Sequence, residues 1–421
     1  MNLEKKIREE MYEYMKEVVS KLNVKILNKT VSPRDFSVVL MLYPIIHEYF
    51  NVGMEWEEFV YEICLYFKHE IENNRISDIS AFSGLGEIAF GIKCYSNYTG
   101  KLVTFSNQVD ELLYIKLEKH SEFLFNNSIV SMSEYDIIGG ISGIALYLSK
   151  YYDKQFPNTV KYLCSLFEVD KDGDINIRVL CEQQFLEKEK IDFPEGHMNF
   201  GLSHGILGPL LALSQIYKNI DEINLRCSII KIIKFGLAIY EKYSYIKNEV
   251  IKWPSQLDYR KFSKGITIRE KDVYNYPSWC YGYVSISNSI NRICNTTHVE
   301  FNGHLTIDMN KQMNELRQII EEKDISLCHG IAGEILFLSL VGDNEIIDTK
   351  IELMLRIIRN NSNEKFYYRK KYSLISNSED FSVFKGHPEN LNILEGTGGI
   401  FLLFSKLLYS NSEIEELLFL R

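Results

Sequence analysis

A short glycine-rich turn that opens directly into an apolar helix recurs along most of this 421-residue chain. Successive copies lie roughly 50 to 75 residues apart, which leaves room for two helices and a connection in each repeat. The copies are Ser83-Gly84-Leu85-Gly86, Gly139-Gly140-Ile141-Ser142-Gly143, His204-Gly205-Ile206-Leu207-Gly208, Cys280-Tyr281-Gly282, Cys328-His329-Gly330-Ile331-Ala332-Gly333 and Glu395-Gly396-Thr397-Gly398-Gly399. We expect a single all-α domain over residues 1–421, assembled from helix pairs.

Helical periodicity fills the stretches around these turns. Apolar residues repeat at three- and four-residue steps in 35–50, 56–73, 223–243, 306–322 and 346–359. Apolar inner helices that alternate with amphipathic outer ones predict a closed double ring, an α/α toroid. Residues 35–50 would supply an inner helix before the first glycine turn and so complete seven pairs. An open solenoid of helix pairs stays an alternative, because repeats alone do not distinguish a ring from a stack.

Two segments depart from the helical pattern. Residues 174–181 alternate in polarity and are rich in β-branched side chains, which predicts a strand. Residues 247–276 are polar, aromatic and irregular. We therefore expect insertions near 165–195 and 244–276, with residues 171–181 as the core of a small β-containing addition.

Composition excludes several classes of protein. Lys and Arg number 47 against 57 Asp and Glu, and this net charge of −10 argues against nucleic acid as a partner. The 8 cysteines are too scattered for a disulfide scaffold in a chain of this length. The N-terminus reads as a charged amphipathic helix without an apolar signal core. No apolar run reaches the ~18 residues of a membrane span. We expect a protein of the reducing cytoplasm.

Chemically reactive side chains gather in the glycine turns. Cys280 lies in one turn, Cys328 and His329 lie in another, and His204 lies in a third. If the turns meet at one end of a ring, these groups converge. Two cysteines and a histidine form a soft ligand set suited to zinc, and three protein ligands leave the fourth position open, as in catalytic sites. The alternative is that each cysteine is simply a small buried apolar residue.

Four motifs, taken in order, resemble those of the lanthionine synthetase C family, the cyclases of lantibiotic biosynthesis. They spread over about residues 83–400 and comprise 199–208 (NFGLSHGILG), 278–282 (SWCYG), 328–333 (CHGIAG) and 395–400 (EGTGGI). The resemblance implies an α/α toroid with a central zinc ion. By motif match it implies Cys280, Cys328 and His329 as metal ligands, and His204 and Asp136 as active-site residues.

The reaction implied by this resemblance closes thioether rings in a precursor peptide, leader plus core, whose Ser and Thr residues have been dehydrated. A peptide cysteine adds across the double bond of dehydroalanine or dehydrobutyrine and forms lanthionine or methyllanthionine. His204 would protonate the resulting enolate, and Asp136 would orient His204 or help remove the thiol proton. Tyr281 and Tyr276 are candidates for substrate hydrogen bonds, although Tyr276 stands where the family often has a basic residue.

The family resemblance also suggests partners, and several competing functions have to be weighed against it. The family suggests docking onto a dehydratase and an ABC exporter, which would place a cytoplasmic protein peripherally at the inner face of the membrane. A non-catalytic toroid that serves as a peptide-binding scaffold stays an alternative. A glycosidase would need two facing carboxylates. Prenyl-diphosphate chemistry would need a basic pocket, and the motif turns contain no Lys or Arg.

Overall fold

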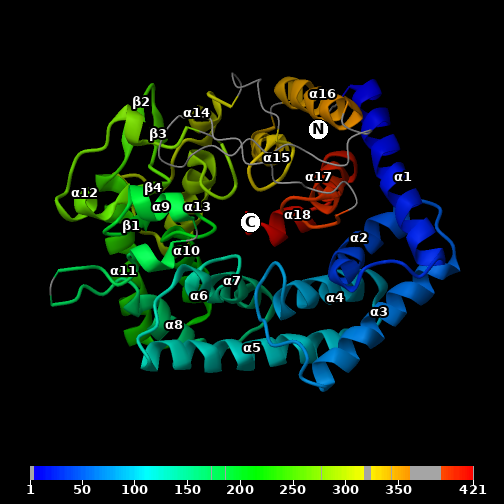
Figure 1. Cartoon of the computed structure of the whole chain (residues 1–421), viewed down its shortest axis with the longest axis horizontal. Helices are drawn as coiled ribbons and strands as arrows, with labels where there is room; N and C mark the ends of the chain where they lie inside the picture. Colours follow the sequence, from blue (N-terminus) through cyan, green and yellow to red (C-terminus); the bar gives the residue numbers. More distant parts are fainter. Residues whose placement is uncertain are drawn as a thin grey trace.

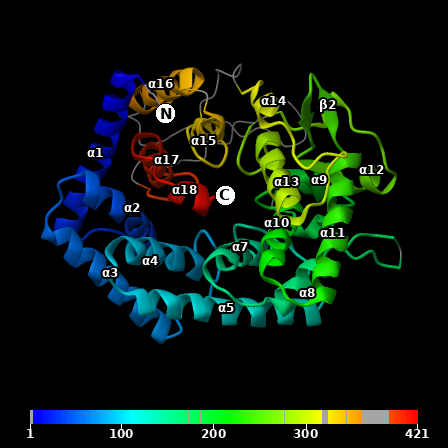
Figure 2. The ribbon, with the colours of Figure 1, turned by 180° about the vertical axis from the view of Figure 1, so that it is seen from behind.

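The computed structural model describes residues 4–171, 173–184, 186–275, 277–316, 324–342, 344–360 and 390–420. Within these ranges the chain is all-α apart from two short strand pairs, and its helices form two concentric rings (Figures 1 and 2). The seven described inner helices are α2 (Phe36–Tyr49), α4 (Leu85–Thr99), α7 (Ile141–Tyr151), α10 (Leu207–Ile216), α13 (Tyr283–Thr297), α15 (Ile331–Val341) and α17 (Thr397–Tyr409). The predicted α/α toroid is confirmed.

Seven further helices form the outer ring in the described part of the chain. They are α1 (Lys5–Leu27), α3 (Met54–Glu72), α5 (Val103–Asn126), α8 (Pro157–Ser165), α11 (Ile223–Lys242), α14 (Met309–Met313) and α16 (Asn344–Asn360). The helix expected over 306–322 is described only as α14, and residues 317–322 of that range lie outside the description. Shorter helices complete the fold: α6 (Met132–Tyr135), α9 (Glu187–Asp192), α12 (Tyr259–Ser263), α18 (Glu413–Leu417), and the 3₁₀ helices η1 (Pro33–Asp35), η2 (Cys181–Gln183), η3 (Tyr217–Asn219) and η4 (Glu270–Asp272).

The ring closes where the last inner helix packs against the first. The rings of Tyr49 and Tyr409, which end α2 and α17, stack with their centroids 3.6 Å apart. Phe50 and Phe401 lie 6.1 Å apart beside them. Because an open stack would leave its terminal helices unpaired, the solenoid alternative is wrong.

Burial explains which helices lie inside. Every residue of α10 is buried, and its sequence is apolar apart from Ser214 and Gln215. The outer helix α11 buries mainly one stripe, which includes Ile229, Ile233, Leu237 and Tyr240 at three- and four-residue steps. The apolar and the amphipathic periodicity therefore separate the two rings correctly.

Six of the seven described inner helices, all except α2, begin at the glycine turns, and a repeated Asp or Asn shapes four of these turns. In these four turns the side-chain oxygen of this residue accepts a hydrogen bond from the backbone N–H two residues later. The backbone carbonyl of the same residue accepts a second hydrogen bond, from the backbone N–H of the residue at the helix start or next to it. The four residues are Asp78, Asn199, Asp324 and Asn390, and their carbonyls accept from Leu85, Ile206, Ile331 and Thr397. These turns therefore share one backbone conformation.

Most of the described β structure lies in one of the two segments that the sequence singled out, the one near 244–276, and one strand, at 197–199, lies outside both. Strand β1 (His197–Asn199) pairs antiparallel with β4 (Gln256–Asp258), and β2 (Tyr245–Lys247) pairs antiparallel with β3 (Val250–Lys252). The strand predicted over 174–181 is wrong: Ile175 and Val179 form isolated bridges only. The segment is instead a loop that folds against the core and so buries its alternating apolar side chains without a partner strand. The division into one domain with insertions near 165–195 and 244–276 stays a prediction.

Among the described helices, none has both the length and the apolar character that a bilayer span requires.

A buried carboxyl group at the start of α4 makes stability depend on pH. Glu87 is 8% exposed and accepts a hydrogen bond from Ser37 Oγ at 2.8 Å. Burial raises the pKa of Glu87 to about 7, and the hydrogen bond from Ser37 only partly offsets this rise. Between the ordinary glutamate pKa and 7, the folded chain holds a proton that the unfolded chain releases, so stability falls as pH rises.

We predict that Glu87→Gln removes this loss, because the amide needs no proton to stay neutral. At pH 8 the variant should be more stable than the parent by on the order of 2 kcal/mol, and at pH 4.5 the two should be alike. Chemical denaturation at both pH values measures this, with the exposed Glu58→Gln as control. Equal pH dependence in the parent and in Glu87→Gln would contradict the assignment.

Candidate active site

Backbone hydrogen bonds join the glycine turns at one pole of the ring into a continuous band. Each bond connects a turn with its neighbour around the ring. They run from Ile137 N to Ser203 O (2.9 Å), from Leu202 N to Cys280 O (2.8 Å), from Trp279 N to Cys328 O (3.1 Å) and from Cys328 N to Leu394 O (3.0 Å). Five turns that are far apart in sequence are therefore held in fixed register.

Close packing in this band requires glycine at position 201. A Cβ atom on Gly201 would lie 2.5 Å from the Tyr281 ring and 2.8 Å from the carbonyl oxygen of Cys280. Both distances are shorter than van der Waals contact, and the second involves backbone. Glycine thus lets the turn that carries His204 lie directly against the turn that carries Cys280.

Two cysteines and one histidine converge within the band. The Sγ atoms of Cys280 and Cys328 and a ring nitrogen of His329 all lie within 4.8 Å of one another. Both cysteines are buried, whereas His329 is half-buried. Among the described residues this is the one such group of His, Cys, Asp or Glu side chains. The other six cysteines are free and lie elsewhere.

The structure joins Cys280 and Cys328 as a disulfide, with their Cα atoms 5.9 Å apart. The two sulfurs can share this bond or act as two thiolate ligands, but not both. In the reduced state the cluster fits zinc in both size and chemistry. Bonds of about 2.3 Å to sulfur and 2.0 Å to nitrogen place tetrahedral donors within about 4 Å of each other. The soft sulfur donors and the imidazole suit the same metal.

His204 and Asp136 form a pair next to this cluster. His204 Nδ1 lies 2.5 Å from Asp136 Oδ2, and the carboxylate is only 2% exposed. Its other oxygen, Oδ1, accepts hydrogen bonds from the backbone N–H groups of Gly139 (2.7 Å) and Gly140 (2.8 Å). The carboxylate is thus fixed just before α7 and in turn fixes the Nδ1 side of the imidazole.

Tyr281 links the two groups. Its ring centroid lies 6.3 Å from that of His204 and 6.4 Å from that of His329, and it is nearly parallel to the His329 ring. The structure therefore gathers Asp136, His204, Tyr281 and the Cys–Cys–His cluster at one pole. Tyr276, the other tyrosine named from the sequence, lies outside the described residues.

The sequence interpretation missed a support beneath the cluster. Trp279 precedes Cys280, is buried, and donates its indole N–H to the carbonyl oxygen of Leu418 at 3.0 Å. Phe82 packs edge-on against the same indole at 5.7 Å. Residues after α18 thus reach the centre of the ring and brace the turn that carries Cys280. The only sequence signal was a tryptophan beside a candidate ligand.

The chain is similar to known proteins over most of its length. The family model described as "Lanthionine synthetase C-like protein" matches residues 40–419. The nisin biosynthesis protein NisC of Lactococcus lactis subsp. lactis is 26% identical over 350 residues, which covers 79% of this chain and 74% of that protein. A solved structure of nisin cyclase matches with a TM-score of 0.69 at 20% identity and covers 97% of both chains. This structural likeness shows a shared fold.

We predict that any zinc held by the reduced cluster is bound roughly tenfold more weakly in Trp279→Phe, because loss of a group that orients a ligand typically costs 10- to 100-fold in metal affinity. Competition with a chromophoric chelator measures the affinity. The control is Trp253→Phe, which removes another buried indole that donates to a backbone carbonyl, that of Tyr240 at 2.8 Å, outside the band. Equal affinities in the two variants would show that the Trp279 contact does not support the cluster.

Proposed function

This chain belongs to the lanthionine synthetase C-like family, and on that premise we propose that it is a zinc-dependent lanthipeptide cyclase. The reaction is an intramolecular Michael addition of peptide cysteine thiolates to dehydroalanine or dehydrobutyrine, which yields lanthionine and methyllanthionine. The observation that most supports it is the meeting of Cys280, Cys328 and His329 beside the His204–Asp136 pair.

Cys280, Cys328 and His329 would hold the metal, with both sulfurs reduced. A bound zinc ion supplies charge that stabilises the peptide's thiolate at neutral pH. The protein's part is to keep two sulfur donors and one imidazole at fixed positions, which the hydrogen bonds of Trp279 and Cys328 in the backbone band accomplish.

His204 supplies the proton that completes the reaction. When the peptide sulfur bonds to the β-carbon, the π bond breaks and negative charge moves onto the enolate. The α-carbon must then gain a proton, and imidazole is the side chain best suited to donate one near neutral pH. Asp136 holds Nδ1 at 2.5 Å and leaves Nε2 as the nitrogen that faces away from the carboxylate. The thiol gives up one proton and the α-carbon gains one, so product and substrate are isomers.

The N-termini of the inner helices favour the developing negative charge. Helices α7, α10, α13 and α15 all begin at or just after the turns that carry the proposed site residues. Each N-terminus carries a partial positive charge of about half an elementary unit. Fixed dipoles directed at an enolate stabilise it without reorganisation. Tyr281 would contribute a wall and a hydrogen bond to the peptide, and Tyr276, which lies outside the described residues, stays a candidate for a second hydrogen bond.

The remaining assignments rest on family membership. The substrate is a dehydrated precursor peptide with leader and core. A dehydratase and an ABC exporter are the proposed partners, and they would hold a cytoplasmic protein at the inner face of the membrane.

Removal of either cysteine should abolish metal binding. We expect about one zinc ion per reduced wild-type chain, and less than a tenth of that in Cys280→Ala and in Cys328→Ala, because two ligands hold zinc far more weakly than three. Elemental analysis measures the metal, and circular dichroism should show the helices retained. Cys227→Ala, at an exposed free cysteine, is the matched control. Undiminished zinc in both ligand variants would point to other ligands.

Loss of His204 should slow the cyclisation reaction without loss of the metal. His204→Ala should keep its zinc yet consume the thiols of a dehydrated peptide at least 100-fold more slowly, as expected when a general acid is removed. Asp136→Asn should fall between this variant and the wild type. His120→Ala, whose histidine pairs with Glu134 instead, is the control.

Two results would overturn these roles. A wild-type rate in His204→Ala would exclude this residue from proton transfer. A zinc-loaded wild-type protein that binds the dehydrated peptide but consumes no thiol would favour the non-catalytic scaffold.

A further inference from the structure

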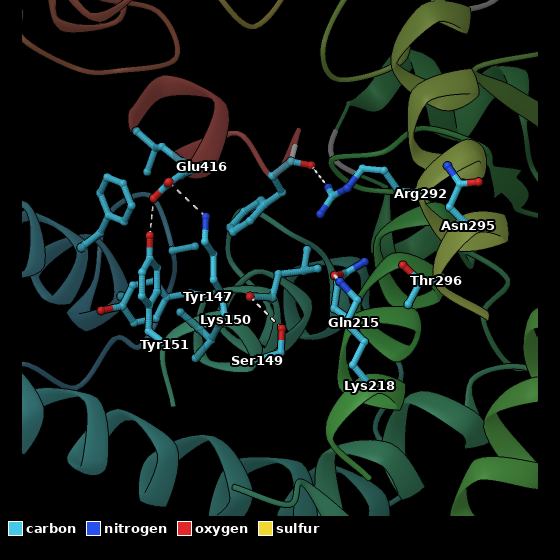
Figure 3. Close-up of a pocket in the computed structure, with 17 residues that line it drawn as sticks. Tyr147, Ser149, Lys150, Tyr151, Gln215, Lys218, Arg292, Asn295, Thr296 and Glu416 are labelled. Atoms are coloured by element: carbon cyan, nitrogen blue, oxygen red, sulfur yellow. Dashed lines mark hydrogen bonds and ion pairs between the residues drawn. The ribbon is translucent and has the colours of Figure 1, made fainter. Parts of the chain in front are cut away.

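A cavity of about 330 Å³ lies inside the ring and reaches the ends of the inner helices opposite the glycine turns (Figure 3). Its walls include Tyr151 at the end of α7, Lys218 in η3 just after α10, Thr296 near the end of α13, and Glu416 of α18. The glycine turns lie at the other ends of these helices. Because α7 has 11 residues, the two poles are separated by roughly 15 Å. Ala81 and Gly86, at the first glycine turn, also line the cavity, but none of the proposed metal ligands or active-site residues does.

Three cationic side chains and one carboxylate line this cavity. The cations are Lys150, Lys218 and Arg292, and the carboxylate is Glu416. Lys150 Nζ lies 3.1 Å from Glu416, which also accepts a hydrogen bond from Tyr151. Figure 3 shows these groups on one side of the cavity and Arg292 on the opposite side. An excess of positive charge thus faces the cavity in a chain whose net charge is −10.

Lys218 is held close to other positive charges. Its Nζ atom donates to the neutral side-chain oxygen of Gln215 at 2.7 Å. Its pKa is lowered from the ordinary lysine value, first by burial and then by the charges of Arg292 and Lys150. An anion between these cations would relieve the repulsion.

The floor of the cavity is apolar, whereas its mouth is polar. Phe90, Ile144 and Phe419 are buried and supply apolar surface. Lys150, Lys218 and Asn295 are exposed and surround the opening. A volume of about 330 Å³ falls in the range of small-molecule sites, which typically combine an apolar lining with a few convergent polar groups.

We propose that this cavity binds a small amphipathic anion: a carboxylate or phosphate group paired with Lys218 and Arg292, on an aryl or alkyl body that packs against Phe90 and Phe419. The head group enters into charge-assisted hydrogen bonds, and the body displaces water from the apolar floor. The site requires neither the metal nor the cyclisation reaction proposed above.

Calorimetry with 3-phenylpropionate and with phenyl phosphate tests the proposal on the intact protein. At low ionic strength, at least one of the two should bind saturably at one site per chain. The uncharged 3-phenylpropanamide tests the need for the anion, and inorganic phosphate tests the need for the apolar body. Both should bind at least tenfold more weakly, since a hydrogen bond to a charged group and a buried ring each contribute that much or more.

Variants locate the binding. Lys218 is exposed, so Lys218→Gln should fold normally and weaken binding roughly tenfold, whereas Lys218→Arg should restore it. Lys234→Gln, at an exposed lysine of α11 that does not line the cavity, is the control. Because carboxylates also bind zinc, Cys328→Ala must retain full affinity for the probe.

The proposal would be overturned by no saturable binding of either anion, by equal binding of the neutral amide, or by unchanged affinity in Lys218→Gln. In each case the only role of the cations would be to interact favourably with the partial negative charge at the C-termini of the helices around the cavity. Loss of probe binding in Cys328→Ala would place the anion on the metal instead.

Discussion

The backbone hydrogen bonds that join the glycine turns are the constraint on which the rest of the structure depends. They connect five turns, from the one that contains Ile137 to the one that contains Leu394, across more than half of the sequence. Helix packing alone would leave each loop free to adjust, and a site assembled from separate loops would be imprecise. Because each turn bonds to its neighbour, Cys280 and Cys328 emerge from positions that are mutually fixed. The same band orients the N-termini of the inner helices toward one centre, so the polar groups and the positive potential coincide there.

Much of the fold could be predicted because the two rings have different periodicities. The largely apolar α10 and the amphipathic α11 are distinguishable from sequence, since a helix buried on all sides needs no polar face. The repeats alone did not distinguish a closed ring from an open stack, because closure depends on Tyr49 meeting Tyr409 near the two ends of the chain; the family resemblance favoured the ring. The strand expected over 174–181 was wrong for a related reason. Alternation reports burial on one side, and a loop folded onto the core produces it as readily as a strand.

The sequence indicated which described side chains come together at the candidate site, but not the contacts that support them, and the roles of these residues stay predictions. Cys280 and Cys328 could be brought together from sequence because they occupy equivalent places in a repeat whose turns share one pole. The pairing of His204 with Asp136 came from the family resemblance, and the structure places the two side chains in contact. The contact between Trp279 and Leu418 joins residues 139 positions apart and has no periodic signal. By contrast, the recurring Asp or Asn of the turns was visible in the sequence, and its side-chain hydrogen bond to the backbone is a known turn-forming interaction.

X-ray absorption at the zinc edge of the reduced, purified protein tests the central claim most directly, because it reports which atoms surround the metal. Our account predicts two sulfur neighbours at about 2.3 Å and lighter neighbours, one of them the nitrogen of His329, at about 2.0 Å. Zinc surrounded by nitrogen and oxygen alone would contradict it. So would full zinc occupancy in protein whose Cys280–Cys328 disulfide remains intact, since sulfurs bonded to each other cannot serve as thiolate ligands.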